Sequence, residues 1–560
     1  MQIKQSVRKR RMVRVSLIGL TVLLTLSFMQ VSLAANGERK VVPGGVIPEL
    51  TVLSLTPGYS PERFEMTRRL EEIWEKEIGL KINRVIMDYN ALMDRALGPA
   101  HDFDMLILHW GATAVRTDPD VFIYQFHHSS MDRPFAYNVV GYHNPEFDKI
   151  AEKTRLYYDL EERRKWVWKA QEMLYEEQPR TPFIFDEVLF CWNSDRWADP
   201  NNYHKDIGMG VAGFWFQWGA VPKTKDNILK LAYPRPLRTL NPLFATQKFD
   251  LQVIRNIYDS LMRVGPDGKV RMWAAEDVKR INDTTLEVVL RNDLKFHDGK
   301  PLTVEDVKFT FDFMKKWGAL NYYSALKEVE SVEIVGDRKL RINLKRPFAP
   351  IYVTVFAQMP ILPKHIWTEV EKKWDDPKNY PNEHPIGSGP YKWEYWEKGS
   401  EFMVKRFEEH SNPAKPGGLL YLIYGSTDAM VGAVEAKEAD AVIMYIQPFQ
   451  FERTTALPYI SGEPLQLHGF YDLWYNCRRP PMSDKAFRNA IARTIPAEQF
   501  IKDIFKGYGK HESTVIGSAN KFWHNPNLPP IPFDLGEAKR ILKEAGYTWN
   551  DEGRLCYPQS

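Results

Sequence analysis

The chain has 560 residues, enough for roughly three or four domain-sized units. Its 44% hydrophobic and 26% charged residues exclude an intrinsically disordered chain and indicate a buried core. The formal net charge of +3 becomes −3 without residues 1–34, which hold six positive and no acidic side chains, so bulk charge argues against nucleic-acid binding.

Residues 1–34 have the pattern of a secretory signal peptide. A positive stretch ends at Arg14, an apolar run covers 15–29, and Ser32-Leu33-Ala34 offers small residues for cleavage. The run is shorter than the ~20 residues of a spanning helix, although an uncleaved anchor remains an alternative. We therefore expect an exported protein, in the periplasm or at the extracellular face of the cytoplasmic membrane.

The next segments alternate between strand and helix patterns. Residues 48–97 predict a strand, an amphipathic helix, a second strand and the start of another helix. "HDFDMLILHWGATAVRTDPDVFIYQF" predicts a strand followed by a loop that begins with a tryptophan. "DLEERRKWVWKAQEMLYEEQP" predicts a helix, "RTPFIFDEVLFCWNS" a strand, and "GAVPKTKDNI", 219–228, a linker.

The stretch "LKFHDGKPLTVEDVKFTF", 294–311, predicts a strand end, a turn and a capped helix. Asp298-Gly299 is a turn signal, and Thr303 with Asp306 three residues on resembles a capping box. The following apolar residues occupy two helical faces, so we expect a helix buried on most sides. This stretch indicates architecture and not a site.

Five further segments complete a recognisable order. They are "RTLNPLFA" near 240, "PIGSGPYKWEYWEKGSEFMVKRFEEH" at 385–410, "AVEAKEADAVI", "LWYNCRRPPMSDKAFRNAIARTIPAEQFIKDIFKGYG" at 473–509 and "DLGEAKRILKEAGYTWNDEGRL" at 534–555. Together with "FHDGKPLTVEDVKFTFDFMKK" they resemble the family 5 extracellular solute-binding proteins, the oligopeptide- and dipeptide-binding branch of ABC-importer receptors. Three positions depart from the family motifs, namely Asn241, Lys437 and Ala439.

The order of the segments differs from the family order. The six motifs belong to the family's first two-thirds, whereas residues 48–192 resemble its last third. The resemblance therefore implies a circularly permuted chain, which is tolerable because the termini of compact domains often lie close together. The alternative is a non-functional fusion of two solute-binding gene fragments.

The resemblance implies an α/β fold, a two-lobed clamp like that of class II periplasmic binding proteins, with an extra subdomain in the larger lobe. We expect 48–182 and 471–560 to form the smaller lobe, 226–470 the larger lobe, and 183–225 the crossover and return. The two crossover strands would be 183–192 and 470–477.

The implied function is capture of a small-molecule ligand in a cleft that closes by a hinge motion, followed by delivery to an ABC permease. We expect a monomer, no enzymatic activity and no cofactor. By motif match, the ligand-binding residues of the smaller lobe are Tyr89, Trp110, Gly111 and Thr113. Softer candidates are Thr246, Gln247, Phe249, Tyr322 and, beside the hinge, Trp474.

Thr113 bears on the ligand class. Peptide-binding relatives that anchor a free amino terminus carry an Asp three residues after the loop tryptophan, and a hydroxyl cannot neutralise a cation. With the many aromatic residues, this favours an oligosaccharide over an oligopeptide. Asp118 or Asp120 could take the role of the anchor if the loop is shifted.

Cysteines and histidines leave further alternatives. Cys191 and Cys477 end the two crossover strands and could form a hinge disulfide or remain free thiols, while Cys556 reads as unpaired. His127-His128 and His297 could suggest nickel, but adjacent histidines favour a surface position. A secreted carbohydrate-active enzyme stays open, since no pair of acidic residues is singled out by spacing.

Overall fold

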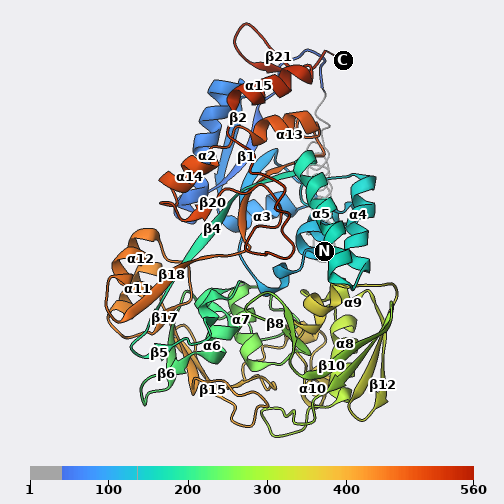
Figure 1. Cartoon of the computed structure of the whole chain (residues 1–560), viewed down its shortest axis with the longest axis vertical. Coiled ribbons are helices and arrows are strands. Elements are labelled where there is room, and N and C mark those ends of the chain that lie inside the picture. The colour runs from blue at the N-terminus through green and yellow to red at the C-terminus, as the bar shows by residue number, and fades with distance from the viewer. Residues whose placement is uncertain (1–40, 135, 208, 560) are drawn as a thin grey trace, which may run out of the picture.

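The computed structural model describes residues 41–134, 136–207 and 209–559, and its ribbon forms an upper and a lower part (Figure 1). The upper part consists of described residues up to 179 and from 476 onward, so blue and red segments lie together there. The lower part, residues 194–469, runs from green to orange. Strand β4 (Arg180–Asn193) passes from one part to the other.

The upper part is built on the strands β1 (Leu50–Leu55), β2 (Ile82–Met87), β3 (Met105–Trp110) and β19 (Phe470–Tyr475). β1 pairs in parallel with both β2 and β3. β19 lies between β3 and the start of β4 and is antiparallel to both. β19, from the carboxy-terminal half of the chain, thus shares a sheet with β1, β2 and β3 from its first 110 residues.

Helices cover both faces of these strands, and they come from the same two chain segments. They are α2 (Pro61–Ile73), α3 (Tyr89–Leu97), α4 (Pro145–Leu156), α5 (Leu160–Glu177), α13 (Lys485–Ala492), α14 (Ala497–Asp503) and α15 (Leu535–Glu544). Asp88 and Asp159 accept backbone N–H bonds at the starts of α3 and α5, as good N-cap residues do. One core cluster combines side chains from 47–107 with side chains from 471–557, and the indole of Trp74 donates to Thr494 at 2.8 Å.

The lower part continues the sheet from the second half of β4. Its strands follow in the order β17 (Ala441–Val442), β7 (Ile228–Tyr233), β16 (Gly418–Ile423), β15 (Glu401–Arg406) and β14 (Tyr391–Glu397). β18 (Ile460–Gln466) also pairs with this half of β4, whereas β20 (Gly509–Lys510) of the upper part pairs with Phe185 and Asp186. The helices here are α6 (Phe214–Gly219), α7 (Lys248–Ile257), α10 (Lys364–Lys373), α11 (Thr427–Glu435) and α12 (Pro448–Thr455).

A separate four-stranded antiparallel sheet forms a subdomain of the lower part. Its order is β10 (Ala275–Asn282), β11 (Thr285–Leu290), β13 (Lys339–Leu344) and β12 (Val329–Gly336), with α8 (Val304–Lys316) and α9 (Tyr323–Leu326) alongside. The predicted capping box is confirmed, because Thr303 and Asp306 bond each other reciprocally at the start of α8. Gly299 has φ 85°, which suits glycine in the predicted turn.

Three two-stranded pairs complete the described elements. They are β5 (Trp197–Ala198) with β6 (Val221–Pro222), β8 (Met262–Val264) with β9 (Val270–Met272), and β21 (Thr548–Trp549) with β22 (Leu555–Cys556). Val46 forms an antiparallel bridge with Cys556, Ile47 N–H donates to Leu555 O at 2.9 Å, and Gly44 N–H donates to Pro558 O at 3.0 Å. The first and last described residues are therefore paired at the tip of the upper part.

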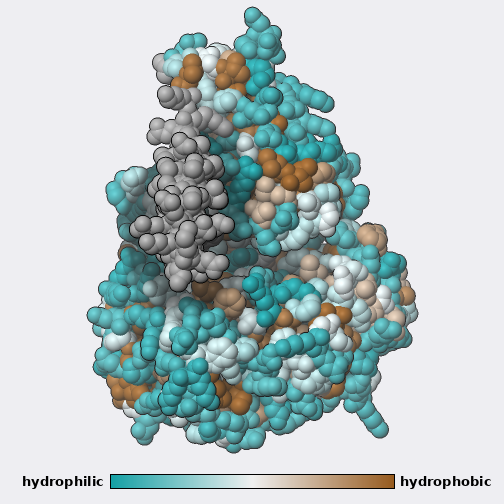
Figure 2. All heavy atoms as spheres, turned by 180° about the vertical axis from the view of Figure 1, so that it is seen from behind, coloured by the Kyte–Doolittle hydropathy of each residue, from teal (hydrophilic) through white to brown (hydrophobic). Residues whose placement is uncertain are grey.

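The expected mixed α/β fold with a large sheet is confirmed. Seen from behind, the lower part is the broader mass, and apolar patches are scattered over a mostly hydrophilic surface (Figure 2). In the part of the chain that the structure describes, no helix is long and apolar enough to cross a bilayer. The predicted signal peptide lies outside the described residues.

Candidate ligand-binding site

The carboxyl ends of three parallel strands converge on one edge of the upper part. β1, β2 and β3 run in the same direction, so the segments that follow Leu55, Met87 and Trp110 lie at the same edge. In open α/β sheets this edge is where ligands usually bind. The predicted residues Tyr89, Gly111 and Thr113 all lie there.

The loop after β3 folds back on itself. Residues 114–117 form a single 3-10 turn, and the hydroxyl of Thr117 donates to Ala114 O at 2.7 Å. The guanidinium of Arg116 donates to Gly111 O and lies 5.1 Å from the centre of the Trp110 ring. The loop therefore places an arginine, not a carboxylate, over the tryptophan.

Trp110 and Trp474 belong to the core of the upper part. Their rings stack with centroids 5.7 Å apart, and Phe126 lies 4.4 Å from Trp110. Trp110 is 7% exposed and Trp474 is fully buried. The prediction that Trp474 contacts the ligand is therefore wrong in this structure, because its ring has no accessible face. Trp110 keeps only a narrow exposed edge.

Tyr89 occupies the expected position, as the first residue of α3. Its half-buried ring stacks on Tyr59 with centroids 5.3 Å apart, and burial raises the pKa of its hydroxyl. Tyr59 and Tyr137, 55% and 45% exposed, were not predicted as site residues. Tyr59 could have been predicted as a site residue from its place in the loop directly after the parallel strand β1. No comparable sequence signal marks Tyr137, whose ring meets the Trp110 ring edge-on.

The predicted residues of the lower part divide into exposed and buried ones. Thr246 and Gln247 are exposed just before α7, and Phe249 is half-buried against Tyr233. Tyr322 is 5% exposed and its hydroxyl donates to Gln358 O at 3.1 Å. Tyr322 is thus a core residue, whereas Thr246 and Gln247 are accessible.

One face of α7 lies toward the loop after β3. Lys248, Gln252 and Arg255 have the spacing of a single helical face. Gln252 and Arg255 line a cavity of about 40 Å³ together with Ala114 of the loop. A cavity of this size holds water and not a sugar ring. A ligand would therefore require the two parts to separate here. A larger pocket of about 290 Å³, near Pro236 and Trp396, is lined by the lower part alone.

His468 joins the two parts just before β19. Its Nε2 lies 2.9 Å from Thr113 O in the upper loop, and its Nδ1 lies 2.8 Å from Ile207 O in the lower part. Burial lowers the pKa of His468 to about 4. A neutral imidazole has one N–H, so it can donate to only one of these two carbonyls at a time. Neither the motifs nor the spacing indicated this residue.

The acidic residues of the loop are engaged in buried ion pairs. Asp118 accepts two bonds from Arg163, at 2.7 and 2.8 Å, and Asp120 lies 2.9 Å from Arg155. Asp118 and Asp120 are 3% and 1% exposed. The hypothesis that either carboxylate anchors a ligand ammonium is therefore wrong, because both already neutralise buried arginines.

A second buried pair lies beneath the tryptophans. Arg180 Nη1 is 3.6 Å from Asp472 Oδ2, and the guanidinium is 4.1 Å from the Trp474 ring centre. Burial raises the pKa of Asp472 to about 7, while Arg180 works in the opposite direction. The pair connects the two crossover strands β4 and β19.

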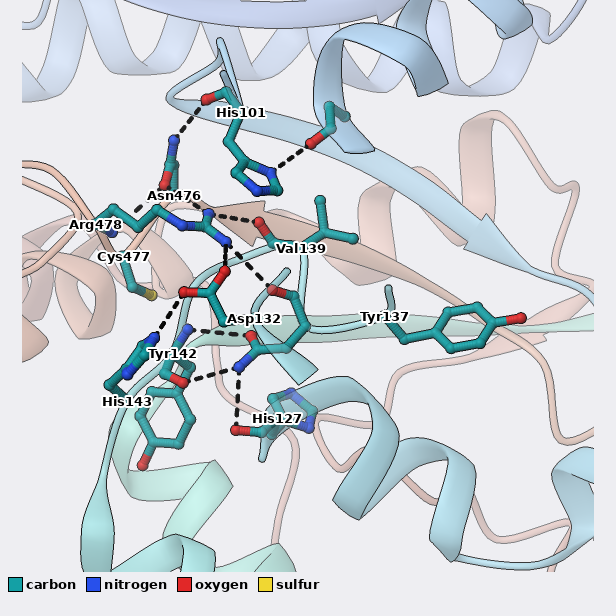
Figure 3. Close-up of polar contacts among 12 residues, drawn as sticks. His101, His127, Asp132, Tyr137, Val139, Tyr142, His143, Asn476, Cys477 and Arg478 are labelled. Atoms are coloured by element: carbon teal, nitrogen blue, oxygen red, sulfur yellow. Dashed lines mark hydrogen bonds and ion pairs between the residues drawn. The ribbon is translucent and has the colours of Figure 1, made fainter. Parts of the chain in front are cut away.

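A polar network connects the loop before α4 with the residues after β19 (Figure 3). Arg478 donates to Asp132 and, at 2.8 Å, to Val139 O, and Asp132 accepts from His143 at 2.6 Å. Asn476 donates to His101 O at 2.9 Å. Residues about 340 positions apart thus fix one another in the upper part.

The two adjacent histidines differ from the expectation. His127 and His128 are 0% and 7% exposed, so their predicted surface position is wrong; the His127 ring is bonded to Phe122 O at 2.9 Å. Among the described residues no group of three or more His, Cys, Asp or Glu could hold a metal ion.

The cysteines are free thiols in the structure, and no disulfide joins Cys191 to Cys477. The crossover strands do pair, but they are antiparallel. Trp474 therefore lies opposite Arg180, near the start of β4, whereas Cys191 lies near its other end, opposite Gly462.

Comparison with known proteins places the chain in a family. The model of bacterial extracellular solute-binding proteins, family 5 Middle, matches residues 269–558. The oligopeptide-binding protein AppA of Bacillus subtilis is 26% identical over 324 residues, which cover 56% of this chain and 57% of AppA. The glutathione-binding protein GsiB of Salmonella choleraesuis is 25% identical over 346 residues, which cover 60% of this chain and 65% of GsiB.

A solved structure of AppA from Bacillus subtilis in complex with a nonapeptide aligns with a TM-score of 0.46 at 20% identity, over 59% of this chain and 66% of that one. The chain spans about three fifths of the length of the curated relatives that it matches. Because the family model covers more than half of its residues, the chain belongs to the family 5 bacterial extracellular solute-binding proteins.

Proposed function

We propose that the protein is the extracytoplasmic receptor of an ABC importer and binds an oligopeptide- or oligosaccharide-sized ligand between its two parts. Its family membership is the observation that carries this proposal. The arrangement supports it, because the upper loop of residues 111–117 faces α7 of the lower part across a small cavity. We also propose that the protein is a monomer and delivers its ligand to an ABC permease in the membrane.

The mechanism would be hinge closure around the crossover strands β4 and β19. These strands pair with each other and pass close to the junction of the two parts, where His468 contacts both Thr113 and Ile207. A ligand favours closure only if it binds the closed state more tightly than the open one. Groups that contact the ligand from both parts would supply that difference.

The lobe boundaries and the permuted order are also proposals. A lobe made of 48–182 and 471–560, facing a larger lobe of 226–470 across the crossover 183–225, is supported by the shared strands and the core cluster that both segments form. A match restricted to 269–558 is what a permuted order predicts, since a linear family model can follow only one of the two segments. A fusion of two solute-binding gene fragments whose halves do not form one domain would not be expected to share a sheet.

Two ligand classes remain within the proposal. The exposed rings of Tyr59 and Tyr137 beside Tyr89 suit stacking on sugar rings. The relatives AppA and GsiB are named for oligopeptide and glutathione binding. Peptides and oligosaccharides are therefore both included in the test.

Thermal melting of the purified protein against a panel of short peptides and oligosaccharides tests the proposal. A ligand that binds only the folded state at 100 times its Kd adds about 2.7 kcal/mol and raises the midpoint. We expect one cooperative transition that members of one ligand class raise. Two unlinked transitions, with no ligand raising either, would contradict both the receptor function and the single permuted fold.

A further inference from the structure

The inference concerns the charge at the junction of the two parts. Arg116 is the remaining charged residue of the 111–120 loop once Asp118 and Asp120 are paired with Arg163 and Arg155. Its guanidinium bonds to Gly111 O and lies over the Trp110 ring. Within the described residues, no Asp or Glu forms an ion pair with Arg116. Arg116 is half-buried, and burial lowers the pKa of its guanidinium.

A second cation approaches the same place from the lower part. Lys248, the first residue of α7, donates to the hydroxyl of Tyr445 at 3.0 Å, and its ammonium lies 4.7 Å from the centre of that ring. A Cβ on Gly111 would lie 3.9 Å from the same hydroxyl. Tyr445 thus stands between Lys248 and the backbone that holds Arg116. No ion pair of Lys248 with an acidic side chain occurs in the described ranges.

The wall beside them carries charges of both signs, since Asp206 and Arg255 line the same cavity. Arg255, on the same face of α7 as Lys248, donates to Gln358; burial lowers its pKa, and the charge of Asp206 opposes that shift. His468 has both Arg116 and Lys248 among the charges that lower its pKa. Arg163 and Arg180, which are almost fully buried, instead form ion pairs with carboxylates, Asp118 at 2.7 Å and Asp472 at 3.6 Å.

We propose that the ligand carries a carboxylate and that Arg116 and Lys248 bind it from opposite sides of the cleft. This rests on the proposed receptor function. Arginine suits the two oxygens of a carboxylate, and charge-assisted bonds of this kind are roughly twice as strong as neutral ones. Thr113 stands where peptide-binding relatives that anchor a free amino terminus carry an Asp, so the loop would select a negative group in place of a positive one.

The same arrangement links the ligand to closure. Two cations brought together from the two parts repel each other unless an anion lies between them. A carboxylate ligand would remove this repulsion only in the closed state, which is the differential affinity that closure requires. The carboxylate could be the terminal carboxylate of a peptide or the carboxylate of a uronic acid.

Binding of matched probe pairs to the purified protein tests the proposal by titration calorimetry. One pair is a set of tri- to hexapeptides as free acids and as carboxy-terminal amides. The other is oligogalacturonates and their methyl esters. We expect the acidic member of one pair to bind at least about tenfold more tightly than its neutral partner, and its affinity to fall as the salt concentration rises.

Four variants and one control locate the effect. Arg116→Gln and Lys248→Gln should each reduce the preference for the acidic probe about tenfold, whereas Arg116→Lys and Lys248→Arg should keep most of it. Lys437→Gln is the matched control, because Lys437 also lies over a tyrosine ring, 4.0 Å from the centre of Tyr459, but at an exposed helix end. It should bind like the unaltered protein.

The outcomes separate the two proposals. Equal binding of acidic and neutral partners, or an unchanged preference in Arg116→Gln and Lys248→Gln, overturns the carboxylate inference and leaves the receptor function standing. Failure of every probe to bind contradicts both. Preference for the peptide acids or for the galacturonates decides which source of the carboxylate the cleft accepts.

Discussion

Arg163 and Arg116 belong to two neighbouring regions that differ in how the charge of the arginine is balanced. Below the loop, Arg163 makes two bonds to Asp118, and both side chains are almost fully buried. At the rim, Arg116 has carbonyl and aromatic partners and, among the described residues, no paired carboxylate. Asp118 supplies the counter-charge of the buried Arg163, whereas the proposed carboxylate ligand would supply that of the half-buried Arg116.

The strongest test of this contrast removes the deep cation. Arg163→Met should lower the free energy of unfolding by about 4 kcal/mol, because it leaves Asp118 buried without its partner. Urea denaturation followed by circular dichroism measures the loss. The double variant Asp118→Leu, Arg163→Met should recover much of it, since no uncompensated charge remains.

The rim provides the matched comparison. Arg116→Gln should change stability by no more than about 0.5 kcal/mol, as substitutions without a buried partner usually do. If Arg116→Gln lowered the free energy of unfolding as much as Arg163→Met, Arg116 would be a structural residue like Arg163, and the contrast between the two arginines would be wrong.

Trp110 lies between the two regions, in contact with Arg116 on one side and with the core on the other. Its replacement distinguishes a core residue from a ligand-contacting one. Trp110→Ala should cost about 3 kcal/mol of stability, because it opens a cavity between Phe126 and Trp474. Trp110→Phe should cost clearly less. Chemical denaturation of both variants checks this. Unchanged stability together with weaker ligand binding would return Trp110 to the ligand-contacting role expected from its motif.

His468 should make the stability of the protein depend on pH. A histidine in the unfolded chain titrates near pH 6.5, whereas burial lowers the pKa of His468 to about 4. Between these values the unfolded chain binds a proton that the folded chain does not, so stability falls as the pH falls through this window. A shift of this size corresponds to about 3 kcal/mol over the window.

His468→Gln should therefore flatten the stability curve between pH 6.5 and 4. Denaturation midpoints of both proteins at matched pH values measure the difference, which should be constant above pH 6.5 and narrow below it. Parallel curves across the whole window would show that His468 titrates alike in the folded and unfolded chains.

Local features of the fold were predictable from the sequence. The capping box of Thr303 and Asp306, the position of Tyr89 at the start of α3 and that of Trp110 at the end of β3 depend on residues close together in the chain. Spacing and propensity describe such short-range relations directly.

The balance of charges at the site was not predictable in this way. Asp118 looked available because its partner, Arg163, lies 45 positions away. Lys248 and Tyr445 are 197 positions apart, and neither is marked by a motif. The antiparallel pairing that separates Cys191 from Cys477 is likewise a property of the sheet and not of either strand. Burial and long-range pairing decide these features, and a single sequence does not display them.

The pairing of residues 44–47 with 555–558 has a mechanical consequence. The two segments are antiparallel, so Gly44 and Pro558 lie together at one end of the pair. The chain continues from this same end toward both of its termini. A force applied through the two chain ends would therefore break these bonds one after another, as in a zipper, and not all at once. Under load, the tip of the upper part should open first, while the lower part stays shielded behind it.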